Sequence, residues 1–325
     1  MNFEIPKETN TGKLLEVTLG ATSDQGGTRI HTIKIGGRTA LPFHFFEGQH
    51  PHPPRVAMEV FDKKPEKYPA LLLDYFGDVI DKPGDMAKKC VEEYGAELIS
   101  VRLDATHPEK GNKSADEAAE TVRLVLDSVG VPIIVTGHSH YEKINDVMKK
   151  VCEVTAGENC LINYVEKDNY KTIAAACLAY GHTIVAQTPI DVNLAKQLNI
   201  LLTEMNFPKE KIVMDPLTGA LGYGLEYTYS IMERISIDAL AGDAMMAFPM
   251  LANPGYESFR VKETRAPEED YPDWGDLMLR GAYWELVTAM SLLVAGADLL
   301  ILYHPQTVAT VKSKIEEMSK AKGGE

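Results

Sequence analysis

The sequence predicts a (β/α)8 barrel, the TIM-barrel fold, preceded by an N-terminal β-hairpin extension. From Arg55 onward, a short apolar segment and a helical pattern alternate eight times over about 265 residues. The apolar segments are hydrophobic throughout rather than at every second position, as expected of buried parallel strands. Both the number of units and their total length match the barrel. The alternative is an open doubly wound sheet, which is disfavoured because no Gly-x-Gly-x-x-Gly opens the first helix.

Residues 1–54 do not follow the repeat. The β-rich segments 14–19 and 29–35 flank a turn-forming stretch, residues 20–27, which predicts an antiparallel hairpin. The proline-rich segment 50–54 predicts a stiff, extended connector. We therefore divide the chain into a β extension with its connector (1–54), the barrel (55–320) and a frayed tail (321–325).

The eight units are placed from their apolar runs and helical periodicity. Strands are expected at residues 56–61, 98–103, 132–136, 160–164, 182–187, 212–214, 245–249 and 298–303. Helices are expected at residues 84–94, 114–128, 141–154, 170–180, 190–205, 225–240, 277–295 and 306–318. The second helix carries a capping box, formed by Ser114 and Glu117.

An acidic, proline-rich insertion, residues 253–276, follows the seventh strand. Two interpretations remain open. It is a solvated surface insertion, or it is a docking loop, because Tyr271 and Trp274 are costly to expose.

Charge and cysteine content limit the possible partners and cofactors. The 33 Lys and Arg against 47 Asp and Glu give a net charge of −14, which disfavours nucleic acid. The four cysteines form no Cys-x-x-Cys pair, so we expect buried thiols and no iron–sulfur cluster or zinc site in this chain. No long uninterrupted apolar run and no N-terminal signal pattern are present, so we expect a cytoplasmic protein without a membrane span.

In a (β/α)8 barrel, the loops that follow the strands form the functional face. Here these loops carry mostly neutral hydrogen-bonding residues, which suit a large polar ligand, and glycines that let the backbone approach a flat one. We predict no catalytic residue, no metal ligand, and the cofactor-binding set His138, Ser139, Asn163, Tyr164, Gln187, Thr188, Asp215, Thr218, Gly219, Gly222, Tyr223 and Gly224.

Three segments resemble a known family. They are residues 135–149, residues 158–164 and above all residues 214–229, with the string Asp-Pro-Leu-Thr-Gly-Ala-Leu-Gly-Tyr-Gly. All three are similar to the small subunit of the corrinoid iron–sulfur protein, whose archaeal counterpart is the delta subunit of the acetyl-CoA decarbonylase/synthase complex. The resemblance covers most of the chain, including the Arg-Val-Ala-Met-Glu segment at 55–59.

The resemblance implies a barrel related to the pterin-binding methyltransferases and a non-catalytic role. Such a subunit forms a heterodimer with a large subunit that carries a [4Fe–4S] cluster and cobalamin. The corrinoid lies between that cobalamin domain and the mouth of the barrel. The heterodimer carries a methyl group from methyltetrahydrofolate to acetyl-CoA synthase in the reductive acetyl-CoA (Wood–Ljungdahl) pathway of carbon fixation. Transient contacts with the methyltetrahydrofolate methyltransferase and with acetyl-CoA synthase follow from that role.

Two alternatives are kept. The first is a stand-alone pterin-dependent methyltransferase, in which Asp104, Asn163 and Asp215 hold the pterin. The second is a metal-dependent hydrolase using His138 and His140 together with His304.

Overall fold

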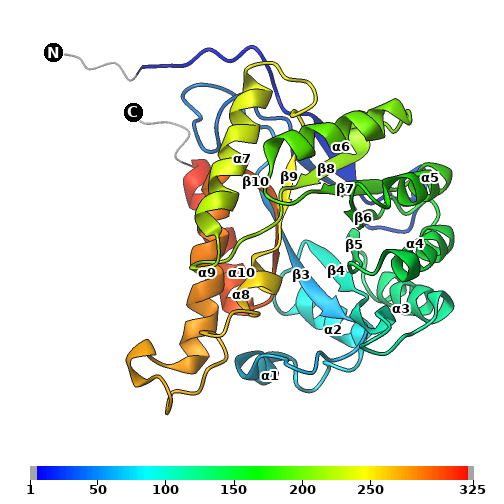
Figure 1. The fold of residues 1–325 in the computed structure, drawn as a ribbon, viewed down its shortest axis with the longest axis vertical. Coiled ribbons are helices and arrows are strands. Elements are labelled where there is room, and N and C mark those ends of the chain that lie inside the picture. The colour runs from blue at the N-terminus through cyan, green and yellow to red at the C-terminus, as the bar shows by residue number, and fades with distance from the viewer. Residues whose placement is uncertain (1–5, 321–325) are drawn as a thin grey trace.

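The computed structural model describes residues 6–320 and contains a closed barrel of eight parallel strands (Figure 1). The strand order is β10-β3-β4-β5-β6-β7-β8-β9, so the last strand pairs with the first barrel strand. The predicted fold is confirmed. The strands are β3 (Arg55–Phe61), β4 (Leu98–Arg102), β5 (Ile133–Thr136), β6 (Leu161–Val165), β7 (Thr183–Gln187), β8 (Ile212–Asp215), β9 (Met250–Ala252) and β10 (Ala297–Leu302).

Helices surround the barrel, one long helix following each strand (Figure 1). These are α2 (Pro83–Glu92), α3 (Ala115–Ser128), α4 (Tyr141–Val154), α5 (Tyr170–Tyr180), α6 (Val192–Glu204), α7 (Leu225–Leu240), α9 (Leu277–Ala295) and α10 (Pro305–Lys320). The sequence prediction missed the short helices α1 (Ala70–Phe76) and α8 (Pro254–Ser258), which are too short for their periodicity to register. Single 3-10 turns occupy Ser23–Gln25, Asp104–Thr106, Lys209–Lys211 and Pro272–Trp274. The Ser114–Glu117 capping box is present.

The predicted seventh strand, residues 245–249, was wrong. The strand is β9, which begins only at Met250. Pro249 has no N–H to donate to the sheet, so it precedes the strand and only accepts a bond, from the backbone N–H of Met214 at 2.9 Å. The carbonyl of Ala247 is already bonded to the N–H of Leu15.

The N-terminal hairpin, predicted and present, closes the N-terminal end of the barrel. Strands β1 (Glu16–Leu19) and β2 (Ile33–Gly36) pair antiparallel, with Val17 opposite Ile35. Hydrogen bonds tie the hairpin to segments that precede barrel strands, for example from Gly20 N to Asn159 O at 3.0 Å. Its apolar side chains join those inside the barrel in one cluster, which we call the floor: Val17, Leu19, Ile33, Ile35, Ala57, Leu98, Ile134, Leu161, Val185, Val213, Leu251, Leu299 and Ile301.

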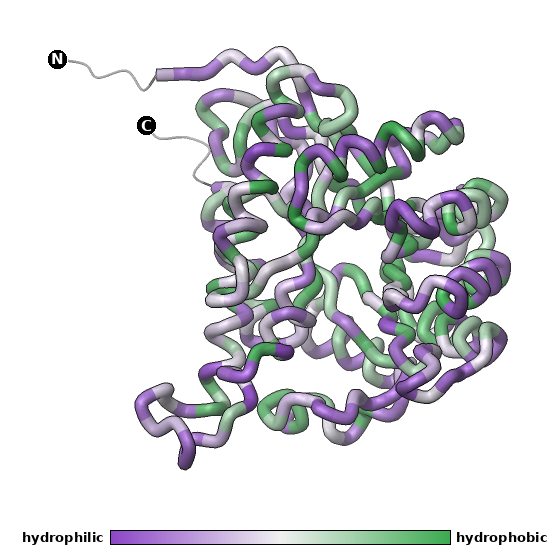
Figure 2. Tube along the Cα trace, in the orientation of Figure 1, coloured by the Kyte–Doolittle hydropathy of each residue, from purple (hydrophilic) through white to green (hydrophobic). Residues whose placement is uncertain are grey.

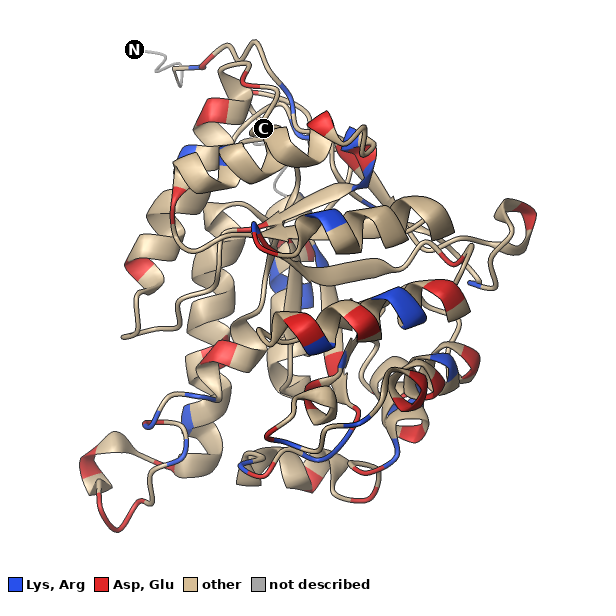
Figure 3. Ribbon diagram, turned by 45° about the vertical axis from the view of Figure 1, so that its right-hand side comes forward, with Lys and Arg blue, Asp and Glu red and all other residues tan. Residues whose placement is uncertain are grey.

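A second apolar core lies between the strands and the helices. Along β3 the side chains alternate, so that Met58 and Val60 join this outer core while Ala57 belongs to the floor. Most charged residues lie on the helices and loops, and the barrel strands are mostly uncharged (Figure 3). All four cysteines are buried and free, as predicted. The predicted frayed tail, residues 321–325, lies outside the described residues.

Helix α9 is long and apolar enough to span a membrane by length and composition alone. In the structure it is a helix of the barrel wall and packs on α7, α8, α10 and β10. Two charged residues, Arg280 and Glu285, interrupt its apolar sequence and are both buried. Glu285 accepts hydrogen bonds from the backbone N–H groups of Tyr303 and His304, so it fixes the end of β10.

The insertion after β9 projects from the barrel and is largely hydrophilic (Figure 2). The rings of its aromatic residues Tyr271 and Trp274 stack on each other, with their centroids 3.9 Å apart. The buried Arg280 of α9 anchors it by donating to the carbonyls of Glu263, Ala266 and Gly275. The insertion is therefore an anchored structural unit, and its docking role stays a prediction.

Candidate functional site

The interior of the barrel changes from apolar to polar toward the C-terminal ends of the strands. Successive inward side chains are two residues apart, so the inward position after each floor residue lies nearer the mouth. On β6 this step leads from Leu161 to Asn163, and on β8 from Val213 to Asp215. We call the resulting buried polar set the mouth layer: Glu59, Ser100, Arg102, Thr136, Asn163, Gln187 and Asp215.

One side of the mouth layer is held together by a network of hydrogen bonds around Glu59. The carboxylate of Glu59 accepts from Arg102 Nε at 2.5 Å, from Ser100 Oγ at 2.8 Å and from Tyr303 Oη at 2.6 Å. The chain of bonds continues from Ser100 to the hydroxyl of Thr136 at 3.0 Å. A buried ion pair stabilises only when such additional bonds satisfy its charges, so this side is a rigid structural unit.

The other side of the mouth layer, together with the adjacent Thr188, has buried atoms that lack partners. Within residues 6–320, Asn163 Oδ1, Gln187 Oε1 and Thr188 Oγ1 make no hydrogen bond. Gln187 donates from Nε2 to Asp215 Oδ2 at 2.8 Å, and burial raises the pKa of Asp215 to about 6. Each unsatisfied buried polar atom costs about 1–3 kcal/mol, so this side is suited to a ligand that supplies the missing partners.

A cavity of about 390 Å³ opens beside these atoms and is lined by both Gln187 and Thr188. Two of its lining residues have left-handed backbone conformations that are unusual for non-glycine residues. These are Tyr164 at φ 98° and Leu217 at φ 67°, in the segments at the ends of β6 and β8. Such strain costs of order 1–3 kcal/mol and is concentrated at functional sites. The rim also carries Glu166, which accepts a hydrogen bond from Tyr141 Oη. Burial raises the pKa of Glu166.

The glycine-containing loop 217–224 is held in place by its own chain. Gly219 N donates to Thr228 Oγ1 at 2.8 Å, and the carbonyl of Leu221 accepts from Trp284 Nε1 at 2.9 Å. A Cβ on Gly219 would lie 2.5 Å from the carbonyl oxygen of Gly224. Gly222 and Gly224 have φ of +73° and +93°, which glycine alone adopts freely. These glycines are required by the loop itself, and their contact with a ligand stays a prediction.

Two further predicted residues of this loop bond to the insertion. Thr218 Oγ1 accepts from the backbone N–H of Asn253 at 2.8 Å, and the hydroxyl of Tyr223 donates to Glu263 at 2.9 Å.

The predicted residues after β5 lie outside the 390 Å³ cavity. His138 bonds through Nε2 to Thr106 Oγ1 at 2.8 Å, and its Nδ1 accepts from His140 N at 3.2 Å. Burial lowers the pKa of His138 to about 4, so the ring is neutral at physiological pH. Ser139 is exposed. The ring centroids of His138 and His140 lie 6.4 Å apart, whereas His304 packs against Tyr75. Among the described residues, no group of three or more His, Cys, Asp or Glu side chains is arranged to hold a metal ion.

Sequence reasoning missed part of the site. Glu59 and Arg102 lie within runs that the sequence presents as apolar strands, and a charged residue in such a run was the available signal. Tyr256 was hidden in the insertion, yet its ring lies 3.8 Å from the guanidinium of Arg102. Asp104, expected to help hold a pterin, instead pairs with Lys110 at 2.6 Å.

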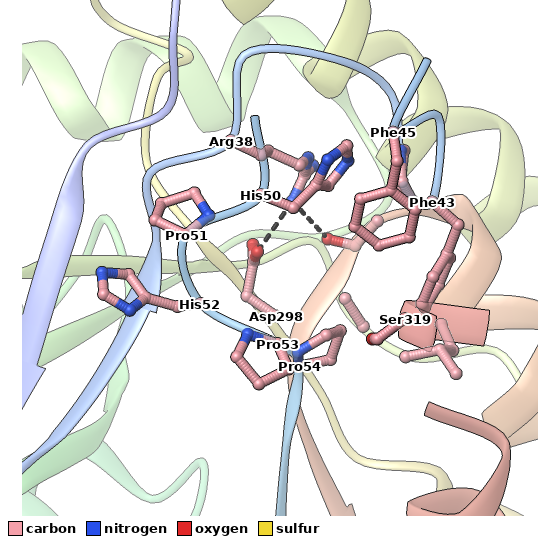
Figure 4. Close-up of a pocket in the computed structure, with 14 residues that line it drawn as sticks. Arg38, Phe43, Phe45, His50, Pro51, His52, Pro53, Pro54, Asp298 and Ser319 are labelled. Carbon is pink, nitrogen blue, oxygen red and sulfur yellow. Dashed lines mark hydrogen bonds and ion pairs between the residues drawn. The ribbon is translucent and has the colours of Figure 1, made fainter. Parts of the chain in front are cut away.

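A small hollow of about 130 Å³ lies near the opposite end of the barrel, beside the proline connector (Figure 4). Arg38 and Asp298 form an ion pair there at 2.7 Å, which joins the N-terminal extension to β10. None of the predicted cofactor-binding residues lines this hollow.

Comparison with known proteins gives one family. Residues 16–319 match the model of the CO dehydrogenase/acetyl-CoA synthase delta subunit. The chain is 39% identical to acetyl-CoA decarbonylase/synthase complex subunit delta of Archaeoglobus fulgidus, over 99% of this chain and 72% of that one. It is 40% identical to subunit delta 1 of Methanosarcina thermophila, over 93% of this chain and 70% of that one.

Solved structures of dihydropteroate synthases have the same fold. The enzyme from Xanthomonas albilineans superposes with a TM-score of 0.55 at 13% identity, over 82% of this chain and 93% of that one. The enzyme from Thermus thermophilus gives a TM-score of 0.54 at 14% identity, over 85% of this chain and 98% of that one. At such low identity the likeness extends to the barrel fold alone.

Proposed function

Because the chain belongs to the CO dehydrogenase/acetyl-CoA synthase delta subunit family, we propose that it is the small subunit of a heterodimeric corrinoid iron–sulfur methyl carrier. In this role it caps the cobalamin of a large subunit while a methyl group passes from methyltetrahydrofolate, or a related pterin, to acetyl-CoA synthase. The four buried free thiols agree with a reducing cytoplasm. The relatives favour this role over the stand-alone methyltransferase, since they are named as subunits of a complex.

The observation that carries the proposal is the unsatisfied side of the mouth layer. A corrin ring bears amide side chains around its rim, and amides need both donors and acceptors. Asn163 Oδ1 and Gln187 Oε1 are acceptors, and the Thr188 hydroxyl is both a donor and an acceptor; none of these three oxygens has a partner among residues 6–320. The 390 Å³ cavity is sized for the amide arms of a macrocycle that lies across the mouth, rather than for the whole ring.

When bound, a corrinoid supplies the metal centre that accepts and releases the methyl group. The residues of this chain would bind its amides, fix its orientation and exclude water from its covered face. The neutral character of Asn163, Gln187 and Thr188 suits that task, because carboxamides and an unactivated hydroxyl are too weakly nucleophilic to compete for the methyl group.

An exposed apolar face beside the mouth supports a protein partner. Its members are Leu217, Tyr223, Tyr227, Tyr283 and Val287, which are between 38% and 64% exposed. They lie on the glycine-containing loop, α7 and α9, which are joined by the bond from Trp284 to the carbonyl of Leu221. Exposed aromatics grouped in this way are typical of protein interfaces. We propose that the large subunit docks here.

Reconstitution with the large subunit tests the proposal. Asn163→Leu and Gln187→Leu should each lower the cobalt retained per heterodimer after gel filtration several-fold. Gln306→Leu is the matched control, because Gln306 is an exposed amide at the start of α10. Equal cobalt retention in all three variants would contradict the assignment of the mouth layer. Failure of the wild-type chain to form any complex with a cobalt-containing partner would contradict the proposed function itself.

A further inference from the structure

The functional face of the barrel has a second cavity, which is basic. It encloses about 280 Å³ between the loop after β3, the loop after β4 and the start of the insertion. Two acidic side chains, Glu66 and Asp104, face six basic ones: Lys63, Lys64, Lys67, Lys110, Arg260 and Arg265. The surplus of four positive charges lies in a chain whose net charge is −14. We call this cavity the basic pocket.

Much of this positive charge is uncompensated. Lys110 pairs with Asp104 at 2.6 Å, and Arg260 pairs with Glu257 at 3.0 Å. No ion pair forms on Lys63, Lys64 or Lys67 within residues 6–320 (17 ion pairs occur there). Like charges gathered without partners repel one another, so their convergence on one concave surface favours an anionic ligand.

The aromatic wall of the basic pocket contacts two guanidinium groups. The centroid of the Tyr256 ring lies 4.8 Å from Arg260, which lines the pocket, and 3.8 Å from Arg102, which does not. Arg102 is only 5% exposed and pairs with Glu59 through Nε. Arg102 therefore supports the Tyr256 ring from inside the barrel, and the pocket's own cationic donors are its lysines with Arg260 and Arg265. Phe259 is buried and completes the apolar part of the lining.

We infer that the basic pocket binds a small ligand group bearing more than one negative charge, either a phosphate monoester or an oligocarboxylate tail. Arginine and lysine form their strongest hydrogen bonds with such oxygens. The volume lies just below the ~300–1,000 Å³ of pockets that enclose whole drug-sized ligands, so it holds an anionic group rather than an extended polymer. The aromatic wall would pack against the adjoining part of the ligand. This inference does not depend on the corrinoid.

Isothermal titration of the full-length chain with inorganic phosphate and with triglutamate, at low and high salt, tests the inference. At low salt we expect saturable binding of at least one of the two, weakened by salt. The triple variant Lys63→Gln/Lys64→Gln/Lys67→Gln should bind at least about tenfold more weakly, a loss of ~1.4 kcal/mol or more. Arg260→Gln should weaken binding in the same direction.

The matched control is Lys143→Gln/Lys149→Gln/Lys150→Gln on α4, which makes the same change in net charge on another surface. Its affinity should equal that of the wild type. Phosphate binding identifies a phosphate ester as the ligand group, and triglutamate binding identifies a carboxylate tail; both support the inference. It is overturned if neither probe binds at low salt, or if both triple variants lose binding equally. Because no large subunit is present, these outcomes leave the proposed function untouched.

Discussion

The floor and the mouth layer are built from the same strands, two residues apart, and they differ in almost every physical respect. Every floor residue is buried and apolar, and the hairpin closes the cluster at the N-terminal ends of the strands. The mouth layer is equally buried but polar, and atoms of Asn163 and Gln187 lack partners there. The comparison teaches that this barrel concentrates stability at its N-terminal end and leaves the opposite end incompletely satisfied, where binding can complete it.

The largest effect is expected at Glu59, because the hydrogen-bonded side of the mouth layer contributes to stability as the floor does. Glu59→Ala removes the acceptor of three hydrogen bonds and leaves Arg102 buried without a counter-charge. The free energy of unfolding should fall by about 3–5 kcal/mol. Urea denaturation measures it. Glu59→Gln keeps an acceptor and should cost less; equal losses would show that charge pairing is not what matters.

The floor should respond in stability alone. Leu299→Ala removes a fully buried side chain next to the hairpin and should lower the free energy of unfolding by about 3 kcal/mol. Cobalt retention by the reconstituted heterodimer, measured well below the unfolding midpoint, should be unchanged. A loss of retention at that temperature would mean that the two ends are coupled and would refute their division of roles.

The pH dependence of Asp215 sharpens the contrast. Burial raises the pKa of Asp215 from its ordinary value of 3.8 to about 6, so the folded chain keeps this proton up to about pH 6. This carboxyl therefore lowers stability progressively as pH rises from 3.8 to about 6, and its full cost persists above that pH. Asp215→Asn should stabilise the protein by about 2 kcal/mol at pH 7.5, and the gain should vanish near pH 4. Urea denaturation at both pH values checks this, and a gain independent of pH would exclude the titration as its cause.

The smallest effect is expected at Thr188. Thr188→Val replaces a buried hydroxyl that lacks a partner by a methyl group of the same shape. Stability should rise by about 0.5–1 kcal/mol, while cobalt retention falls. Thermal unfolding and cobalt analysis of the same samples test both parts. A lower stability would indicate that Thr188 is satisfied within the protein, for instance by a buried water.

The sequence was sufficient for the fold because buried parallel strands are apolar throughout and their helices are periodic. It failed where those signals are weak: β9 has three residues, and Pro249 displaced it from the predicted position. Asn163, Gln187 and Asp215 were predicted because they lie at or next to the ends of predicted strands, and their role in binding stays a prediction. Glu59 and Arg102 were missed because their inward direction depends on the strand register, which no local pattern fixes. The family resemblance was confirmed by the comparisons.

The closure of the barrel joins its first strand to its last. Strand β3 bonds to β10, Arg38 pairs with Asp298, and the floor needs Leu299 and Ile301 together with the hairpin. During synthesis, one edge of the first barrel strand therefore stays unpaired until β10 has left the ribosome. Contacts so distant in sequence form slowly. Until then the nascent barrel is exposed to misassociation, and loss of β10 would leave the ring open.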